Sequence, residues 1–466
     1  MRRAAALITA LASLFGAAIA QDAAPDRRTL SLAAGYKAQF LCSGIFNGGK
    51  SGAQIAADEL TNIYPELEPV LPSLPKASIN RRAKTVSVRF ADDMPPRIAA
   101  WRPFLGCSSL PTGADASFVE NLPRADVDAS AAPKANAPWP DGDALPKGAL
   151  KHENAALTDA IDNAFAGEFG GVTSAVVIVK NGALIDERYL DGYTIHTSQR
   201  TWSVAKSIAA TIIGAAVHEG LLDVTAPTGI PEWSREGDPR QAITLENLLR
   251  MASGLGGRSA GNRTDDVYFG GGLVTEHAVA NRLEATPGAR WRYANNDTML
   301  AMRTLRAAMD DDATYLSFPF EKVLLPIGMT HTALETDWDG NFILSSQVWT
   351  TARDLARLGI LYLNDGVWNG RRILPEGWSE YVATPAPAQP PRAETRPSHG
   401  YGAQFWLYQG YPGVPEGTYA ALGNRGQFII IVPAEGVVIV RRGYDYSGER
   451  FDGPAFAAAV LAALAG

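Results

Sequence analysis

The stretch "RTWSVAKSIAATIIGAAVHEG", from Arg200 to Gly220, places a serine three residues before a lysine. After Ser203 the apolar residues recur at helical spacing, which predicts a helix that begins near the serine and carries Lys206 one turn on, on the same face. The positive end of that helix dipole favours a developing negative charge at the serine. The pair is therefore either a nucleophile with its own base or an ordinary helix start with an exposed lysine.

Serine attack on a carbonyl requires a base, because the hydroxyl is a poor nucleophile until its proton is removed. Lysine serves as that base only if burial or a neighbouring positive charge lowers its pKa toward neutrality. The chain contains a second S-x-x-K match, Ser73 and Lys76, but this one lies among prolines and lacks an apolar helical stripe. We therefore select Ser203 as candidate nucleophile and Lys206 as candidate general base.

Strand and helix signals occur at both ends of residues 148–466. The run "SAVVIVKNGALIDERYL" predicts a hairpin around Asn181-Gly182. Further strands are predicted at "QFIIIVP" and "GVVIVRRG", and helices at "NAALTDAIDNAF", with Asn154 as its cap, and "PAFAAAVLAALAG". Tight turns join antiparallel strands. The pattern therefore predicts an α+β domain, with strands and a helix at each end around a mostly helical middle.

The first twenty residues, "MRRAAALITALASLFGAAIA", have the layout of a secretory signal peptide with an A-x-A cleavage site. The alternative is a retained membrane anchor, but the apolar run is shorter than the ~20 residues that a bilayer requires. We expect no transmembrane segment and a periplasmic or secreted protein. The net charge is -7 and no basic block occurs, which argues against a nucleic-acid or anionic-membrane partner.

Residues 21–110 are interpreted as an N-terminal extension that contains one alternating strand, "KTVSVRF", and is otherwise irregular. Its two cysteines, Cys42 and Cys107, predict a disulfide in an exported protein, with two buried thiols as the alternative. Residues 111–147 are rich in Ala, Pro and Asp, which is typical of an extended linker or a wrapping arm.

A histidine-dependent hydrolase is the competing interpretation, because "GRSAG" places Ser259 in a G-x-S-x-G motif. That motif requires a strand before it and a helix after it, whereas a helical run precedes this one and a loop-like segment follows. The six histidines show no metal-ligand spacing, and no nucleotide-binding motif occurs. We therefore expect neither a metal nor a cofactor.

The segment "TWSVAKS" resembles the first motif of the serine β-lactamase and penicillin-binding-protein superfamily. Together with "ITLENLLRMASGL", it is similar to the branch that contains 6-aminohexanoate-dimer hydrolases (nylon-oligomer hydrolases) and class C-like esterases. The resemblance covers about residues 148–466. It implies a β-lactamase/transpeptidase-like fold, in which an antiparallel sheet flanked by terminal helices packs against a helical subdomain.

The second motif of that superfamily is matched by "YAN", which contains Tyr293 and Asn295. The resemblance implies that Tyr293 relays a proton to the leaving group and that Asn295 orients Lys206 or the substrate. The adjacent Asn296 is an alternative for the second role. A rival match, "YLN", ends an amphipathic helical run, where Tyr362 is better explained by core packing.

The third motif is matched in part by "ALGNRG". The resemblance implies that Gly423 lets the substrate approach closely, and that the backbone N–H groups of Ser203 and Asn424 form the oxyanion hole. Where relatives carry a polar pair that holds a substrate carboxylate, this chain has Ala421 and Leu422. Arg425 is a basic residue that could replace them.

Tyr268 is a further candidate substrate contact by the same resemblance, and the alternative is an exposed loop aromatic. These features predict an exported serine hydrolase that cleaves a small carboxylic ester or linear amide through an acyl-enzyme on Ser203. A β-lactamase or penicillin-binding D,D-carboxypeptidase is one alternative, and a non-catalytic binding relative is another. The sequence does not determine the oligomeric state.

Overall fold

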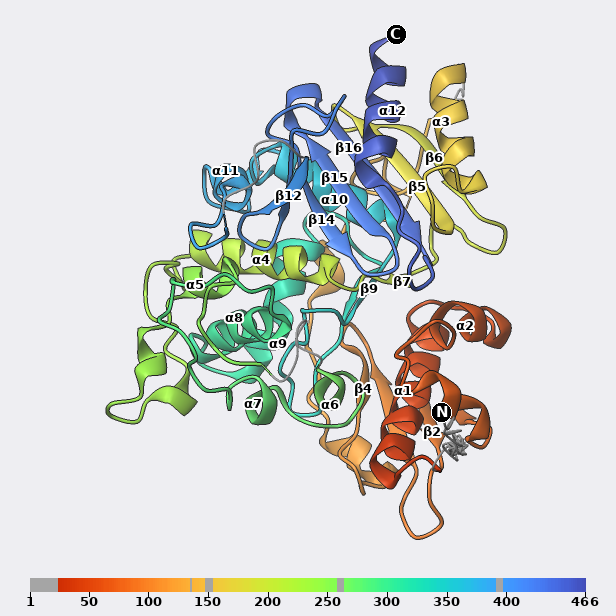
Figure 1. The fold of residues 1–466 in the computed structure, drawn as a ribbon, viewed down its shortest axis with the longest axis vertical. Helices are drawn as coiled ribbons and strands as arrows, with labels where there is room; N and C mark the ends of the chain where they lie inside the picture. Colours follow the sequence, from red (N-terminus) through yellow and green to blue (C-terminus); the bar gives the residue numbers. More distant parts are fainter. Residues whose placement is uncertain (1–23, 135, 147–153, 258–263, 391–396) are drawn as a thin grey trace, which may run out of the picture.

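A seven-stranded antiparallel sheet forms the upper half of the molecule in the computed structural model, which describes residues 24–134, 136–146, 154–257, 264–390 and 397–466 (Figure 1). The strand order is β12-β13-β14-β15-β16-β5-β6. The last strand in the chain, β16, therefore pairs with β5, which comes first in the chain among the strands of this sheet. The strands are β5 (Thr173–Lys180), β6 (Ala183–Tyr189), β12 (Ser398–Tyr401), β13 (Trp406–Gln409), β14 (Tyr419–Gly423), β15 (Gln427–Val432) and β16 (Val437–Gly443).

The predicted hairpin is present between β5 and β6. Asn181 and Gly182 both have positive φ, 51° and 79°, as a two-residue turn of this kind requires. Strand β5 lies inside the sheet and is buried on both faces, which explains its unbroken apolar run. The prediction of an α+β domain with an antiparallel sheet is confirmed. The short strands β12 and β13 were not predicted.

Helices cover both faces of the sheet. Helices α3 (Ala155–Ala166) and α12 (Gly453–Ala465) pack together on one face, and α10 (Ala352–Leu363) and α4 (Val204–His218) pack on the other (Figure 1). The side chain of Asn154 caps α3 by accepting a hydrogen bond from the backbone N–H of Leu157. The two ends of residues 154–466 thus build one layer, as predicted.

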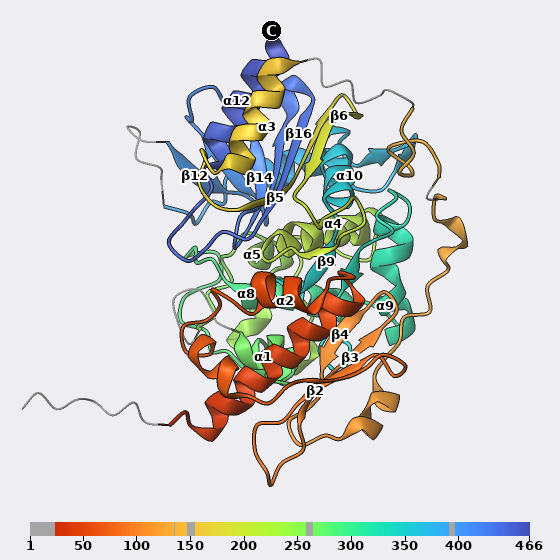
Figure 2. The same ribbon diagram turned by 90° about the vertical axis from the view of Figure 1, so that its right-hand side faces the viewer.

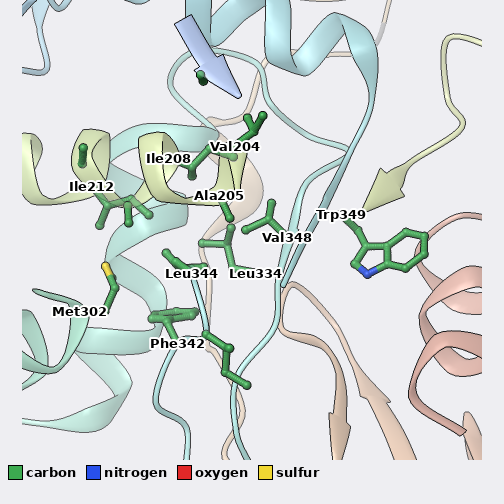
Figure 3. Close-up of a cluster of buried hydrophobic side chains, with 14 of the residues drawn as sticks. Val204, Ala205, Ile208, Ile212, Met302, Leu334, Phe342, Leu344, Val348 and Trp349 are labelled. Atoms are coloured by element: carbon green, nitrogen blue, oxygen red, sulfur yellow. The ribbon is translucent and has the colours of Figure 1, made fainter. Parts of the chain in front are cut away.

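A helical region lies on the other side of α4, which runs along the boundary between this region and the sheet (Figure 1). It contains α5 (Leu245–Leu249), α6 (Asp265–Tyr268), α7 (Val274–His277), α8 (Asn295–Ala307) and α9 (Asp312–Pro319), with α11 (Trp378–Ala383) beside the sheet. Apolar side chains of α4 pack there against Met302 of α8 and against Leu334, Phe342 and Leu344 (Figure 3). This packing keeps α4 buried along most of its length.

A small sheet leads the chain into α4. It consists of β7 (Gln199–Arg200), β9 (Val348–Thr350) and β8 (Ala333–Leu334), in the order β7-β9-β8. Strands of two or three residues are too short to produce a recognisable alternation, so the sequence did not predict them.

Residues 24–110 form an N-terminal unit with more regular structure than predicted. It comprises the helices α1 (Arg27–Phe46) and α2 (Gly52–Glu59) and an antiparallel sheet of β1 (Ser78–Asn80), β2 (Thr85–Val88), β3 (Arg97–Arg102) and β4 (Gly106–Ser109), against which α1 packs (Figures 1 and 2). The expectation of an irregular segment was wrong. Helix α1 was not predicted because it is rich in small residues and lacks a clear polar face. A Cβ at Gly35 would lie 2.2 Å from the carbonyl oxygen of Phe269, so the helix needs such small residues to pack closely.

Covalent and ionic contacts hold this unit together and join it to the sheet. A disulfide links Cys42 in α1 to Cys107 in β4. The buried Lys50 forms ion pairs with Asp58 (3.1 Å) and Glu59 (3.0 Å). Its ammonium also donates to the hydroxyl of Tyr444, directly after β16.

Residues 111–134 and 136–146 lie in an arm that runs up the side of the molecule (Figure 2). The described residues of the arm include two short 3-10 helices, at Ala116–Asn121 and Ala129–Ala131. Arg357 of α10 donates to the carbonyl oxygens of Pro140 (2.7 Å) and Gly142 (2.8 Å), which ties the arm to the sheet domain.

Two predictions fall on residues that the structure does not describe, namely the signal peptide at residues 1–20 and the alternative nucleophile Ser259. Within the described residues, no helix is both long enough and apolar enough to span a membrane.

Candidate active site

Ser203 occupies the N-cap position of α4, and its side chain makes no capping hydrogen bond. The preceding Trp202 has a φ of 50°, a conformation that costs a large side chain on the order of 1–3 kcal/mol. The surrounding structure stabilises this turn. The guanidinium of Arg200 lies 3.6 Å from the Trp202 ring centroid and 4.3 Å from that of Phe40 in α1. The backbone entering α4 is therefore fixed partly by the N-terminal unit.

Lys206 is buried one turn after Ser203, with 1% of its surface exposed. Its Nζ lies 3.3 Å from Ser203 Oγ, 2.8 Å from Asn295 Oδ1 and 2.7 Å from the carbonyl oxygen of Ser345. All three neighbours are uncharged oxygens. Burial lowers the pKa of Lys206 to about 7, so a large fraction of the amine is neutral near neutral pH.

Tyr293 lies two residues before the start of α8, and its ring centroid is 5.0 Å from Lys206 Nζ. The ring packs against Tyr401 and Trp406, with centroid separations of 5.9 Å and 5.3 Å. Burial raises the pKa of Tyr293 above its ordinary range, and a hydrogen bond with Ser203 partly offsets that rise. The phenol is therefore protonated at neutral pH and able to donate.

Tyr268 is buried at the end of α6 rather than exposed on a loop. Its hydroxyl lies 2.7 Å from Ser345 Oγ, and the carbonyl of the same serine accepts from Lys206. Ser345 is a site residue that the sequence analysis missed. Because it contacts the lysine through a backbone carbonyl, its side chain carries no sequence signal for this contact.

Gly423 ends β14 in close contact with the backbone that precedes the nucleophile. A Cβ at this position would lie 2.3 Å from the carbonyl oxygen of Thr201. The glycine is therefore needed to bring Asn424 next to the start of α4. Within the described part of the chain, the backbone N–H groups of Ser203 and Asn424 form no backbone–backbone hydrogen bond outside the regular elements.

The Arg425 side chain is turned toward the N-terminal unit. Its guanidinium donates to the carbonyl oxygen of Asp58 in α2 and, at 3.5 Å, to that of Asp445, and it lies 5.4 Å from the Tyr444 ring centroid. The side chain is thus held at the contact between the N-terminal unit and the end of β16. Ala421 is buried, and Leu422 packs with the outer cluster beneath α3 and α12.

The two rival motifs lie elsewhere. Ser73 and Lys76 are exposed, and Ser73 Oγ donates to the carbonyl oxygen of Val70 at 2.7 Å. Tyr362 is buried, with its hydroxyl 3.0 Å from Thr211 Oγ1 and its ring against Phe405. The interpretation of Tyr362 as a core residue is correct.

A cavity of about 700 Å³ opens beside Trp202, Gly423 and Asn424. The rest of its wall includes residues 62–64 of the N-terminal unit and residues 445–454, which follow β16. The N-terminal unit therefore forms part of the wall of a cavity that begins at Trp202, the residue before the candidate nucleophile.

Comparisons with known proteins agree with this geometry. Residues 161–442 match the family model described as Beta-lactamase. The chain is 24% identical over 296 residues to a 6-aminohexanoate-dimer hydrolase from Paenarthrobacter ureafaciens, a match that covers 58% of this chain and 72% of that protein.

Two solved structures share the fold. A family VIII carboxylesterase has a TM-score of 0.54 at 16% identity, covering 67% of this chain and 97% of the esterase. A penicillin-binding-protein homologue from Caulobacter crescentus has a TM-score of 0.53 at 18% identity, covering 66% of this chain and 96% of that one. With a family model that matches more than half of its length, the chain belongs to the Beta-lactamase family, and the predicted β-lactamase-like fold is confirmed.

Proposed function

We propose that this protein is a serine hydrolase that cleaves carboxylic esters or linear amides through an acyl-enzyme on Ser203. The observation that carries the proposal is the buried Lys206, whose Nζ contacts Ser203 Oγ and two carbonyl oxygens and no carboxylate among the described residues. In the neutral amine, two N–H groups donate to Asn295 Oδ1 and to the Ser345 carbonyl. The nitrogen lone pair then faces the serine and accepts its proton as Oγ attacks.

The remaining steps use groups next to this pair. The backbone N–H groups of Ser203 and Asn424 stabilise the tetrahedral oxyanion, an effect worth ~3–4 kcal/mol for a single donor in a comparable site. Tyr293, protonated and beside Lys206, gives its proton to the leaving group and takes one back from the Lys206 ammonium, which returns the amine to its neutral form. Water then attacks the acyl-enzyme, with Lys206 again as the base, and releases the acid.

The choice of ester or linear amide over β-lactam rests on Ala421 and Leu422. Neither side chain can form a hydrogen bond with a substrate carboxylate, and Arg425 is engaged by the N-terminal unit. Similarity to a 6-aminohexanoate-dimer hydrolase and to a carboxylesterase points the same way. The cavity of about 700 Å³ offers room for an acyl or leaving group of several carbon atoms.

A fluorophosphonate probe tests the nucleophile. We expect mass spectrometry to find the label on Ser203, and Ser203→Ala to lose both labelling and turnover, while the control Ser73→Ala keeps both. Label on another serine would overturn the assignment. Turnover of aryl esters, linear amides and a chromogenic cephalosporin then decides the substrate class, and preference for the cephalosporin would favour a β-lactamase.

We also propose export, on the basis of the first twenty residues and the paired cysteines. Expression of the full chain in a Gram-negative host, followed by fractionation and N-terminal sequencing, tests it. We expect a periplasmic or secreted protein that begins after Ala20. An uncleaved protein in the cytoplasm would contradict the proposal.

A further inference from the structure

We propose a divalent metal site formed by Asp143, His196 and His331, separate from the Ser203 site. Each of the three side chains offers one ligand atom, and these atoms all lie within 4.8 Å of one another. The residues come from three segments, namely the arm, the loop between β6 and β7, and the turn before β8. Spacing rules did not predict the site because its ligands are far apart in the sequence.

The two imidazoles lie next to each other in a tilted arrangement beside the carboxylate. Their ring centroids are 4.9 Å apart with planes inclined by 34°, and His196 Nδ1 is 4.0 Å from Asp143 Oδ2. The ligand atoms of a tetrahedral zinc lie ~3.3 Å apart, given metal–ligand bonds of about 2.0 Å. Small rotations of the three side chains would therefore bring their ligand atoms to the spacing that a bound ion requires. The His196 side chain is 53% exposed, which leaves a path for the ion and a position for a water ligand.

Hydrogen bonds to the ligands fix their orientation, as is usual around metal sites. Asp143 Oδ1 accepts from Arg357 at 2.8 Å and from Arg353 at 3.4 Å, while its Oδ2 is the oxygen nearer to His196. His331 Nδ1 lies 3.2 Å from Thr330 Oγ1, so Nε2 is available to the metal.

The backbone around His331 is also held in place. Its N–H donates to Asp354 Oδ2 at 2.9 Å, and its carbonyl accepts from Ser198 Oγ at 2.8 Å. Only the imidazole ring therefore needs to adjust when an ion binds.

The local charge permits a cation. The two arginines beside Asp143 have further carboxylate partners, since Arg353 donates to Glu187 at 2.8 Å and Arg357 pairs with Asp354 at 2.9 Å. The carboxylates of Asp143, Glu187 and Asp354 thus outnumber the guanidiniums of the two arginines. Two imidazole nitrogens and one carboxylate oxygen are donors that suit zinc and similar first-row metals better than calcium or magnesium.

An ion at this site would tie the arm to the residues that lead through β7 into α4. A ligand that binds only the folded state raises the melting temperature in proportion to the logarithm of its concentration. We therefore expect the metal to stabilise the fold without entering the chemistry at Ser203.

Zinc titration of untagged, chelator-treated protein tests the proposal. We expect calorimetry to show one Zn²⁺ per chain, with a rise in melting temperature. Asp143→Asn, His196→Ala and His331→Ala should each weaken zinc affinity at least tenfold. His218→Ala, which removes an exposed histidine at the end of α4, should leave it unchanged.

Asp143→Asn retains an oxygen that accepts from the arginines, and His196 is exposed, so both variants are expected to fold. Circular dichroism and fluorophosphonate labelling check this point independently of metal binding. The proposal is overturned if the wild type does not bind zinc below millimolar concentration. It is equally overturned if the double variant His196→Ala/His331→Ala binds zinc as the wild type does.

Discussion

The amine of Lys206 and the side-chain carbonyl of Asn295 are joined by a 2.8 Å hydrogen bond that connects helix α4 to the first residue of α8. The amide carries no charge, so it orients the amine without stabilising the ammonium as a carboxylate would. The low pKa of the lysine therefore depends on a neutral residue at position 295. Two predictions follow from this relationship.

The first concerns the pH dependence of catalysis. Because burial lowers the pKa of Lys206 to about 7, the amine is protonated and unable to accept a proton below that pH. We expect kcat/KM to rise about tenfold per pH unit below pH 7 and to level off above it. Hydrolysis of an aryl ester between pH 5 and 9 measures this profile. A rate independent of pH across that range would exclude Lys206 as the base.

The second prediction concerns Asn295→Asp. A carboxylate at this distance raises the pKa of a neighbouring lysine by about 1–3 units. The midpoint of the pH profile should move up by that amount, and the rate at pH 7 should fall about 5- to 500-fold, with partial recovery at pH 9. The matched control Asn364→Asp, on the exposed residue of the rival motif, should keep the wild-type profile. An unchanged midpoint in Asn295→Asp would contradict this prediction.

Gly423→Ala tests the close approach of β14 to α4. The new Cβ would lie 2.3 Å from the carbonyl oxygen of Thr201, so the strand end must move and displace the N–H of Asn424. We expect kcat to fall by about 100-fold or more, the usual loss for one oxyanion donor. Gly52→Ala is the control, since its Cβ meets nothing within 4 Å. Thermal unfolding of both variants separates lost catalysis from lost folding.

Glu335 allows the contact between the N-terminal unit and the small β7-β9-β8 sheet to be tested. It follows β8 and accepts hydrogen bonds from Ser43 (2.5 Å), Asn47 (3.0 Å) and Gln39 (3.2 Å), all on or next to α1. Burial raises the pKa of Glu335 to about 7. Between its unfolded pKa of about 4.3 and pH 7, the folded state binds a proton that the unfolded state lacks, so stability falls as pH rises.

The neutral variant Glu335→Gln should therefore lose less stability than the wild type between pH 5 and pH 7.5. Glu335→Ala should cost about 1–3 kcal/mol at pH 5, because it leaves buried donors without an acceptor, and less at pH 7.5, where the wild type has itself lost stability. Urea denaturation at the two pH values gives these free energies, with the exposed Glu416→Gln as control. A wild type and Glu335→Gln with equal pH dependence would show that Glu335 does not titrate in this window.

Features with a local cause were predictable from the sequence. The hairpin at Asn181-Gly182 follows from the conformation of two residues, and helix α4 follows from an apolar stripe next to a serine that starts a helix. The disulfide required only that two cysteines were available. Tyr293 and Asn295 were predicted because "YAN" matches a motif of the superfamily that the chain resembles, and the structure places both beside Lys206.

Features made by distant segments were not predictable in the same way. The Ser345 carbonyl reaches Lys206 from a loop whose side chains give no indication of it. Helix α1 was missed because it is buried on several sides and has small residues where it packs closely, so no polar stripe marks it. The Arg425 side chain donates to the carbonyl oxygen of Asp58 in α2, and the spacing of residues along the sequence does not reveal this contact.

The contact between Lys50 and Tyr444 has a consequence for synthesis of the protein. Lys50 is made early, but the hydroxyl to which it donates lies near the end of the chain. Closing so long a loop delays the contact until late in folding. The N-terminal unit therefore keeps this surface exposed until the residues up to Tyr444 are available, and a host with abundant chaperones should give the better yield of active protein.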